Sequence, residues 1–479
     1  MKAKMIRAGH EAAVLLLALT VATANPAWAQ AQSGKARGEA VKVEDWLVPY
    51  RSIADRIIAT TANSGDDFAW DRLAFMTDTF GPRHSGSPNL EAALRWAEAE
   101  MKKDGLENVR LEPVMVPHWV RGEESLEILE PFPNKVPLLG LGGSVSTRSE
   151  GVSGELLVVS SFDELNARQD EARGRIVLFN VPYTTYGETV RYRGAGASAA
   201  AKAGAIASLV RAVGPPGMRT PHTGGMRYED GAPKIPTAAI PTEDADRFAR
   251  MAKRGQKVVL RLKMNARFLD HAPSANLIGE LRGSEKPEEI VLVGCHIDSW
   301  DVGTGAMDDG GGCVVTWEAL RLLKNLGLKP KRTIRVVLFT NEENGLAGGN
   351  AYRDTHRAEL EKHVLALESD SGVFRPRGFG FTGSDAARKI LTEIASVLKP
   401  LGADTIGPQG GGADIGPSVT AGKIPSASLE VEGSKYFVLH HTEADTVDKL
   451  DPKDLADNAA AIAFLAYVVA DLPQPLPRP

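Results

Sequence analysis

Short, wholly apolar runs alternate with segments of helical length in the second half of the chain. Three of these runs, 290–295, 333–340 and 364–368, have the length of buried strands. The segment 312–326 lies between the first two and carries apolar residues at helical spacing. Buried strands that alternate with helices are typical of βαβ units. The pattern therefore predicts an α/β fold with a mostly parallel central sheet flanked by helices.

Helix signals also occur outside this region. The clearest helix is 88–103, because Ser87 and Pro88 supply start signals and Gly105 supplies a stop signal. The other expected elements are strands at 276–281 and 426–431 and helices at 46–58, 68–77, 384–398 and 452–472.

Residues 124–265 have a different pattern. Short alternating runs are separated by clusters of Gly, Pro and Ser, and a single small-residue helix is expected at 194–204. We interpret this region as a β-rich domain inserted into the first domain. The first domain is then discontinuous and consists of 30–123 and 266–472.

Three polar segments are expected to lie at the surface. The loop 220–234 is long and Gly-rich, and His222 within it is expected to face solvent. His84 lies in a loop rich in Gly and Pro and is also expected to face solvent. The Pro-rich tail 473–479 is predicted to be disordered.

The first 29 residues have the features of a secretory signal peptide. Lys2, Lys4 and Arg7 precede an apolar run that is too short to span a bilayer, so no membrane anchor is expected. We expect cleavage near Ala29 and export to the periplasm or the extracellular space.

The charge of the chain argues against one class of partner. The formal net charge is −5, and loss of residues 1–29 removes three bases and one acid, which leaves −7. No basic stripe remains, so binding to nucleic acid is not expected.

Side chains with the chemistry of metal ligands follow the buried runs. Ligands of open α/β sheets bind beyond the carboxyl ends of the strands, so these side chains are expected to converge in one crevice. Catalytic zinc takes imidazole nitrogen and carboxylate oxygen, and a pair of zinc ions needs a bridging carboxylate. We therefore predict a site for two zinc ions. Its candidate ligands are His296, Asp308, Glu343, Asp370 and His441.

Two further acids are candidates for catalytic roles. Glu342 is free to act as the general base, which takes a proton from a metal-bridging water and returns it to the leaving amine. Asp298 is placed to accept the other N–H of the His296 imidazole and to fix its tautomer. Isolated acidic pairs are usually solvated, but their recurrence at successive strand ends favours a metal-dependent hydrolase.

The two cysteines, Cys295 and Cys313, leave two alternatives open. They either pack around the site as buried thiols or form a disulfide. Neither belongs to a Cys-x-x-Cys pair, so a cysteine-based zinc site is not expected.

The order of five motifs resembles a known family. The chain is similar to the co-catalytic zinc aminopeptidases and carboxypeptidases, and looks most like their plasma glutamate carboxypeptidase (carboxypeptidase Q) branch. The resemblance covers roughly residues 45–125 and 265–472. The motifs are His296-x-Asp298, Met307-Asp308-Asp309-Gly310, Glu342-Glu343-x-Gly345, Glu368-x-Asp370 and His441-Thr442.

This resemblance implies a zinc-exopeptidase fold and a role for each ligand. It implies that Asp308 bridges the metals, that His296 and Asp370 complete one site, and that Glu343 and His441 complete the other. It also implies a possible homodimer. The inserted region resembles a protease-associated domain through its segments 174–180 and 200–210.

The last ligand is one of two adjacent histidines. The family ligand precedes Thr or Ser, which favours His441 over His440. Adjacent residues of a strand point to opposite faces, so only one of the two is expected to reach the metal.

The leading interpretation is an exported dinuclear zinc exopeptidase that hydrolyses dipeptides or short peptides. The alternatives are an aminopeptidase for longer peptides, a one-zinc glutaminyl cyclase of the same fold, and a metal-free binding or receptor-like module. Asp414 and Glu368 are candidates for binding a substrate amine. Arg375 or Arg377 could instead bind a free carboxylate.

Overall fold

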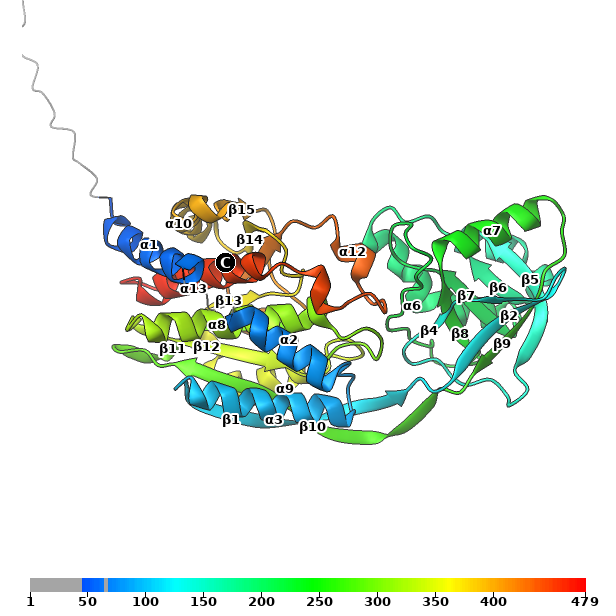
Figure 1. The fold of residues 1–479 in the computed structure, drawn as a ribbon, viewed down its shortest axis with the longest axis horizontal. Coiled ribbons are helices and arrows are strands. Elements are labelled where there is room, and N and C mark those ends of the chain that lie inside the picture. Colours follow the sequence, from blue (N-terminus) through cyan, green and yellow to red (C-terminus); the bar gives the residue numbers. More distant parts are fainter. Residues whose placement is uncertain (1–44, 64–67) are drawn as a thin grey trace, which may run out of the picture. The chain divides into compact units, whose positions relative to one another are not determined.

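An eight-stranded mixed sheet supports the candidate ligands (Figure 1). The computed structural model describes residues 45–63 and 68–479, so the expected signal peptide 1–29 lies outside the described residues. Residues 46–479 form one compact unit. In spatial order the strands are β1 (Glu107–Val120), β10 (Arg267–Leu281), β12 (Arg332–Phe339), β11 (Lys286–His296), β13 (His363–Glu368), β16 (Ser426–Val431), β14 (Pro376–Thr382) and β15 (Thr405–Gly407).

The middle of this sheet is parallel. Strands β12, β11, β13 and β16 run in the same direction, whereas β10 pairs antiparallel with β12 and β14 pairs antiparallel with β16. The three apolar runs of the sequence form β11, β12 and β13, which explains their continuous apolar character, because central parallel strands are buried on both faces. The predicted α/β fold class is confirmed, with parallel pairing concentrated in the centre of the sheet.

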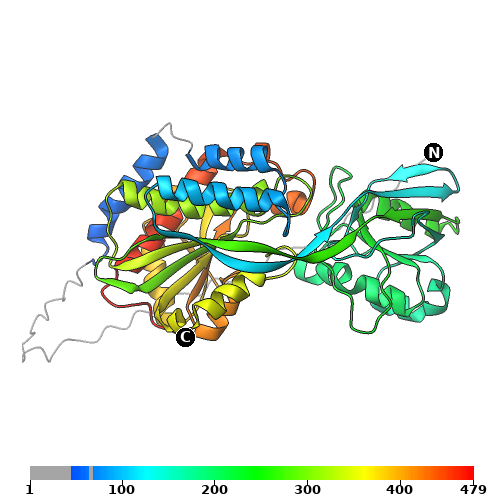
Figure 2. The same ribbon diagram turned by 90° about the horizontal axis from the view of Figure 1, so that it is seen from below.

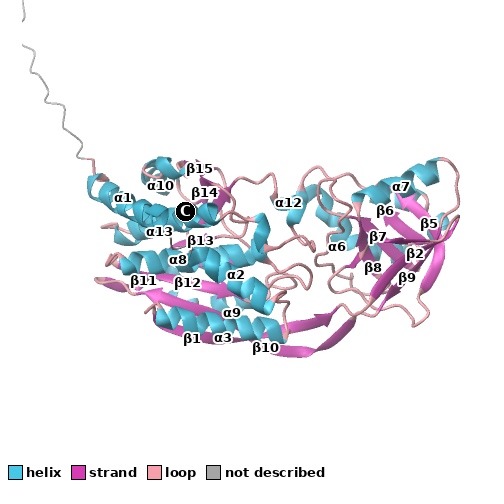
Figure 3. Cartoon of the chain, in the orientation of Figure 1, coloured by secondary structure: helices cyan, strands magenta, loops and turns pink. Residues whose placement is uncertain are grey.

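Helices cover both faces of the sheet (Figures 2 and 3). Val291 and Val293 of β11 face the larger core, whereas Leu292 faces a smaller core on the other side. No described helix combines the length and the apolar character needed to cross a membrane. The larger core contains residues of α1 (Val48–Asn63), α2 (Phe68–Phe80), α3 (Pro88–Lys103), α8 (Gly311–Asn325), α10 (Asp385–Ser396) and α13 (Pro452–Asp471), and the smaller core residues of α9 (Ala347–Thr355) and α11 (Gly416–Gly422).

Strands β1 and β10 form a long antiparallel ribbon, visible in Figure 2. The sequence patterns did not predict β1, because Pro113 and Pro117 interrupt its alternation. Proline is tolerated there because β1 is the edge strand of the sheet. Strand β10 begins at Arg267, well before the expected start at 276.

A second eight-stranded sheet lies between β1 and β10 in the sequence, within 124–265. The region contains more helix than expected, and α6 begins at Tyr186 because Thr185 caps it by accepting a hydrogen bond from the Glu188 N–H. The strands in spatial order are β3 (Asn134–Val136), β2 (Glu124–Glu130), β9 (Val259–Met264), β5 (Val152–Val159), β6 (Ile176–Phe179), β7 (Ala207–Arg211), β8 (Thr237–Ile240) and β4 (Leu139–Gly140), and the helices are α4 (Phe162–Ala167), α5 (Gln169–Ala172), α6 (Tyr186–Lys202) and α7 (Thr242–Lys253).

The tail 473–479 packs against the part of the chain that carries the first sheet, contrary to the expectation of disorder. Leu476 is 2% exposed and belongs to the larger core. Arg478 donates hydrogen bonds to several backbone carbonyls, including that of His363 at 2.9 Å. A buried leucine and a guanidinium that donates to backbone carbonyls therefore outweigh the Pro-rich composition.

Removal of residues 473–479 is expected to destabilise the protein. Exposure of the Leu476 site should lower the free energy of unfolding by about 1.5–3 kcal/mol. Urea unfolding would measure this change. Removal of the exposed Pro479 alone serves as the control and should have no effect. An unchanged midpoint for the longer deletion would contradict the packing of the tail.

Candidate metal centre

The expected ligands gather where the carboxyl ends of adjacent strands meet. His296 is the last residue of β11, and Asp370 lies just beyond β13. Glu343 follows β12, the neighbour of β11 on its other side. Asp308 lies in the turn η1 (Ala306–Gly310), which leads into α8. The strand order therefore brings together residues that are distant in the sequence.

The histidine pair follows the one-turn helix α12 (Tyr436–Leu439) and does not lie in a strand. The Nε2 atoms of His441 and His440 lie 3.4 and 3.6 Å from Asp308 Oδ2, and the two rings stack with centroids 3.5 Å apart. The expectation that only one of them reaches the site is therefore wrong, because the chain turns here instead of extending. His441 also lies 3.0 Å from Glu343 Oε2, which favours it as the ligand.

The carboxylate of Asp308 lies between two pairs of donors. Its Oδ1 is 3.4 Å from His296 Nε2, which in turn is 3.3 Å from Asp370 Oδ1. On the other side, Oδ2 is 3.4 Å from His441 Nε2, which is 3.0 Å from Glu343 Oε2. Oδ1 of Asp308 thus lies beside the His296–Asp370 pair, and Oδ2 lies beside the His441–Glu343 pair.

This donor set fits metal ions. Atoms that bind zinc tetrahedrally at about 2.0–2.1 Å lie about 3.3 Å from one another, which is close to the donor distances given above. Among the described residues, Asp308 Oδ2 and Glu343 Oε1 are buried side-chain atoms without a hydrogen-bond partner. Buried polar atoms are rarely left in this state. Both atoms lie on the Glu343–His441 side of Asp308, where they are available to a cation.

Opposite charges stabilise one another in the site. Burial disfavours an imidazolium, but Glu343 and Asp308 together raise the pKa of His441 to about 9. Burial, followed by the charge of Asp308, raises the pKa of Glu343 to about 7. The acidic surroundings therefore attract protons, and metal cations bind in competition with those protons because ligands must be deprotonated.

A cavity of about 380 Å³ opens onto the site. Glu342, Glu343 and Asp370 line it together with Tyr186 and Arg193, which belong to α6 of the inserted region. The inserted region therefore contributes side chains to the cavity beside the candidate ligands.

Known proteins resemble this chain in sequence and fold. Residues 276–466 match the model of Peptidase family M28. Carboxypeptidase Q of Mus musculus is 48% identical over 438 residues, which cover 91% of this chain and 93% of that relative. The chain belongs to peptidase family M28. A solved structure of a peptidase M28 precursor from Shewanella amazonensis has a TM-score of 0.86 at 38% identity, and the match covers 90% of this chain and 99% of that one.

The family membership confirms the predicted enzyme class. This M28 peptidase is a metallo-exopeptidase that acts on peptides, as the sequence predicted. The fold is also shared with a zinc aminopeptidase from Bacillus subtilis, at a TM-score of 0.63 and 23% identity over 84% of this chain and 94% of that one.

Asp298 supports the site of the M28 peptidase differently from the expectation. The Nδ1 atom of His296 lies 3.0 Å from the backbone carbonyl oxygen of Asp298, but 3.9 Å from its carboxylate. The carboxylate instead accepts the backbone N–H groups of Glu342 at 3.0 Å and Glu343 at 3.3 Å. The buried carboxylate of Asp298 therefore orients the turn after β12. The backbone carbonyl of Asp298, and not its carboxylate, contacts the His296 imidazole.

Two acids without an expected role hold the backbone of the site. The carboxylate of Asp309 accepts the N–H groups of His296 and Gly312, each at 3.1 Å. A Cβ at Gly312 would lie 2.2 Å from Asp309 Oδ1, so no larger residue fits there. Asp445 accepts two successive N–H groups, including that of Asp308 at 3.1 Å. Neither contact follows from residue spacing, because both depend on how the loops close.

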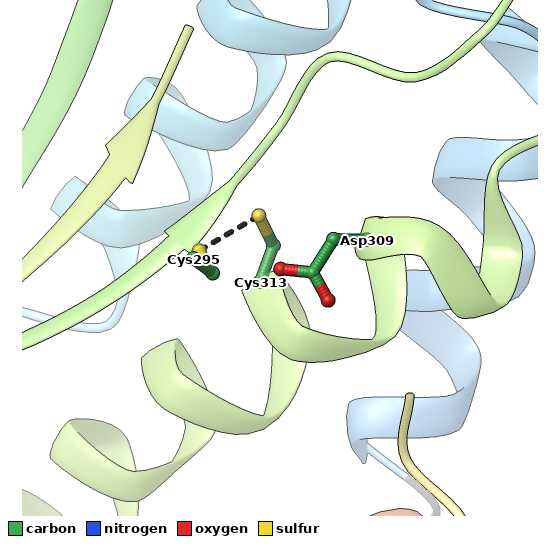
Figure 4. A group of neighbouring side chains, drawn as sticks. All are labelled: Cys295, Asp309 and Cys313. Carbon is green, nitrogen blue, oxygen red and sulfur yellow. Dashed lines mark hydrogen bonds between the residues drawn. The ribbon is translucent and has the colours of Figure 1, made fainter. Parts of the chain in front are cut away.

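The two cysteines, Cys295 of β11 and Cys313 of α8, lie close to Asp309 (Figure 4). Their sulfur atoms are 2.8 Å apart and both are free thiols, which agrees with the first of the two alternatives. The thiol of Cys313 also donates to the His296 carbonyl oxygen at 3.1 Å. Both carboxylate oxygens of the neighbouring Asp309 already accept backbone N–H groups. The cluster is therefore a hydrogen-bonded support of the β11 end.

The two loop histidines expected in solvent are both buried. His84 is 5% exposed and stacks on Trp300, with ring centroids 5.0 Å apart. His222 is 3% exposed. The expectation failed because both loops fold inward towards the site, and a polar composition does not by itself place a loop in solvent.

None of the residues suggested for substrate binding is among the described residues that line the cavity. The carboxylate of Glu368 accepts the N–H groups of Asp414 and Ile415, at 3.3 and 2.8 Å, and so holds the Gly-rich loop. Asp414 is fully buried. Arg375 and Arg377 are exposed, and neither is among the described residues that line the cavity.

Replacing His296 by Ala is expected to lower the zinc bound per chain, because the imidazole is one of the donors beside Asp308. Elemental analysis of the purified protein would measure the change. The exposed His271 offers a matched control, and its replacement by Ala should leave bound zinc unchanged. If the two variants bind the same amount of zinc per chain, the assignment of His296 as a ligand is wrong.

Proposed function

We propose that this M28 peptidase is a dinuclear zinc exopeptidase for dipeptides or short peptides. The observation that carries the proposal is the position of the Asp308 carboxylate between two donor pairs. In this arrangement Asp308 would bridge the two ions, His296 and Asp370 would complete one site, and Glu343 and His441 would complete the other. Export of the mature chain after removal of residues 1–29 is part of the proposal and rests on the sequence alone.

Glu342 is proposed as the general base. Zinc, when bound, supplies a Lewis acid that polarises the scissile carbonyl and lowers the pKa of a bound water. Glu342 lines the cavity, and Asp298 fixes its backbone through the 3.0 Å contact. Burial, followed by the charges of Asp370 and Glu343, raises the pKa of Glu342 well above its usual value. Its carboxylate takes the proton of the attacking water and transfers it to the leaving amine.

Replacing Glu342 by Gln is expected to lower kcat at least ~10²-fold, because the amide cannot accept the proton. Zinc content should remain that of the wild type, because Glu342 is not a proposed ligand. The exposed Glu361, in the short helix η2 (Arg357–Lys362) before β13, provides a Glu→Gln control that should change neither quantity. Full activity of the Glu342 variant would remove the residue from this role.

The direction of cleavage is proposed from Arg193. It is the only lysine or arginine among the described residues that line the cavity, where it lies among the acidic side chains. Its Nη2 donates to the Tyr186 hydroxyl at 2.7 Å, and its Nε is buried without a partner among the described residues. A guanidinium matches a substrate carboxylate. The relative in Mus musculus is named a carboxypeptidase, which agrees with recognition of a free C-terminus.

Replacing Arg193 by Gln is expected to raise KM for substrates with a free carboxylate by about 10- to 100-fold, the effect of one charged hydrogen bond. The measurement compares free, N-acetylated and C-amidated dipeptides and longer peptides by mass spectrometry. Arg191 is exposed on the same helix, and its replacement by Gln is the control.

The peptide panel also separates the alternative functions. The proposal is supported if C-amidation of the substrate lowers the activity of the wild type but does not lower that of the Arg193 variant further. Loss on N-acetylation alone would identify an aminopeptidase and contradict the role of Arg193.

A further inference from the structure

The backbone of His441 adopts a conformation that needs support. Its φ is +62°, in the left-handed region that is strained for a residue with a Cβ. Thr223, in the loop 220–234 of the inserted region, contacts it twice. The Thr223 N–H donates to the His441 carbonyl oxygen at 2.9 Å, and the Thr223 carbonyl oxygen lies 3.3 Å from His441 Nδ1. One residue of the insert therefore holds both the main chain and the ring of His441.

This contact selects the form of the imidazole that can bind a metal. A carbonyl oxygen only accepts, so the proton must lie on Nδ1 of His441 and the lone pair on Nε2. Nε2 is the nitrogen that faces Glu343 and Asp308. Arg193 Nη1 is 3.5 Å from His441 Nδ1. Arg193 Nη1 is itself a donor and binds the Thr223 carbonyl oxygen at 3.3 Å, so this oxygen is the acceptor for the His441 Nδ1–H.

Thr223 is itself fixed from both parts of the chain. It is fully buried, and its hydroxyl donates to the Gly140 carbonyl oxygen at 2.8 Å. The hydroxyl accepts from Arg121 Nη2 at 3.1 Å, and Arg121 Nε donates to Asp301 Oδ2 at 2.9 Å. Asp301 lies in the catalytic part, in the loop after β11. A continuous polar chain therefore links that loop through the insert to His441.

The insert also packs on the helix that precedes His441. Tyr186 stacks on Phe437 of α12, with centroids 5.1 Å apart and an interplanar angle of 20°. It also meets the His440 ring edge-on at 5.4 Å. His296, in contrast, is oriented by Asp298, which belongs to the catalytic part itself. His441 is thus supported from outside its own domain.

We propose that the inserted domain completes the metal centre, with Thr223 as the positioning residue of His441. The affinity of the Glu343–His441 site for zinc then depends on the insert, whereas that of the His296–Asp370 site does not. An acceptor for the second imidazole nitrogen typically changes metal affinity by about 10- to 100-fold. The inference rests on the proposed function, because it takes His441 as a zinc ligand.

Thr223→Val tests the inference, because it keeps the shape of the side chain and removes the hydroxyl that fixes the loop. The experiment titrates zinc into the metal-free full-length protein in competition with a fluorescent chelator. We expect two binding steps in the wild type and a weakening of one step by about 10- to 100-fold in the variant. Thr223→Ser retains the hydroxyl and should restore both steps. Thr220→Val, in the same loop, is the matched control, because within the described part of the chain its hydroxyl donates only to the nearby Met218 carbonyl.

Asp301→Asn provides a second variant, which weakens the same polar chain from the catalytic side. Weakening of the same step in this variant supports the inference, with the urea midpoint of the metal-free protein unchanged. Unaltered binding in both variants would overturn it. Equal weakening of both steps would also overturn it, because Thr223 would then have a general structural role. A single zinc step in the wild type would instead contradict the dinuclear function.

Discussion

The burial of several carboxylates at the ends of parallel strands is the constraint on which the site depends. A buried charge is costly unless hydrogen bonds or cations compensate it. The structure divides these acids into two groups. The acids that accept backbone N–H groups are Asp298, Asp309, Asp445 and Glu368. These four acids fix the loops. Asp308 and Glu343 form the second group, and each retains a buried oxygen atom that a cation can bind.

The strand order determines where the donor side chains lie. Neighbouring parallel strands end at the same edge, so β12, β11 and β13 present their terminal residues side by side. The turn before α8 places Asp308 among them, and the ends of the strands are buried in cores on both faces. The positions of the donors therefore follow from packing that does not involve a metal, which is a form of preorganisation.

Much of the catalytic half was predictable from the sequence, because its signals are local. Apolar runs marked the strands, and His296 and Asp370 follow them directly. The contribution of the insert was not predictable, because Thr223 and His441 are separated by 218 positions and no periodicity links them. The assignment of His440 to a strand failed for a related reason. A single helical turn is too short to show a period.

The ribbon of β1 and β10 has a consequence for the order of folding. Its pairing must close a loop that contains the whole stretch between Val120 and Arg267. Closing a longer loop costs more chain entropy and slows folding. A folded insert already joins its own ends, because the Asn265 N–H donates to the Glu123 carbonyl oxygen at 3.0 Å. A folded insert therefore lowers the entropy cost of pairing β1 with β10. The first sheet is expected to assemble after the insert has folded.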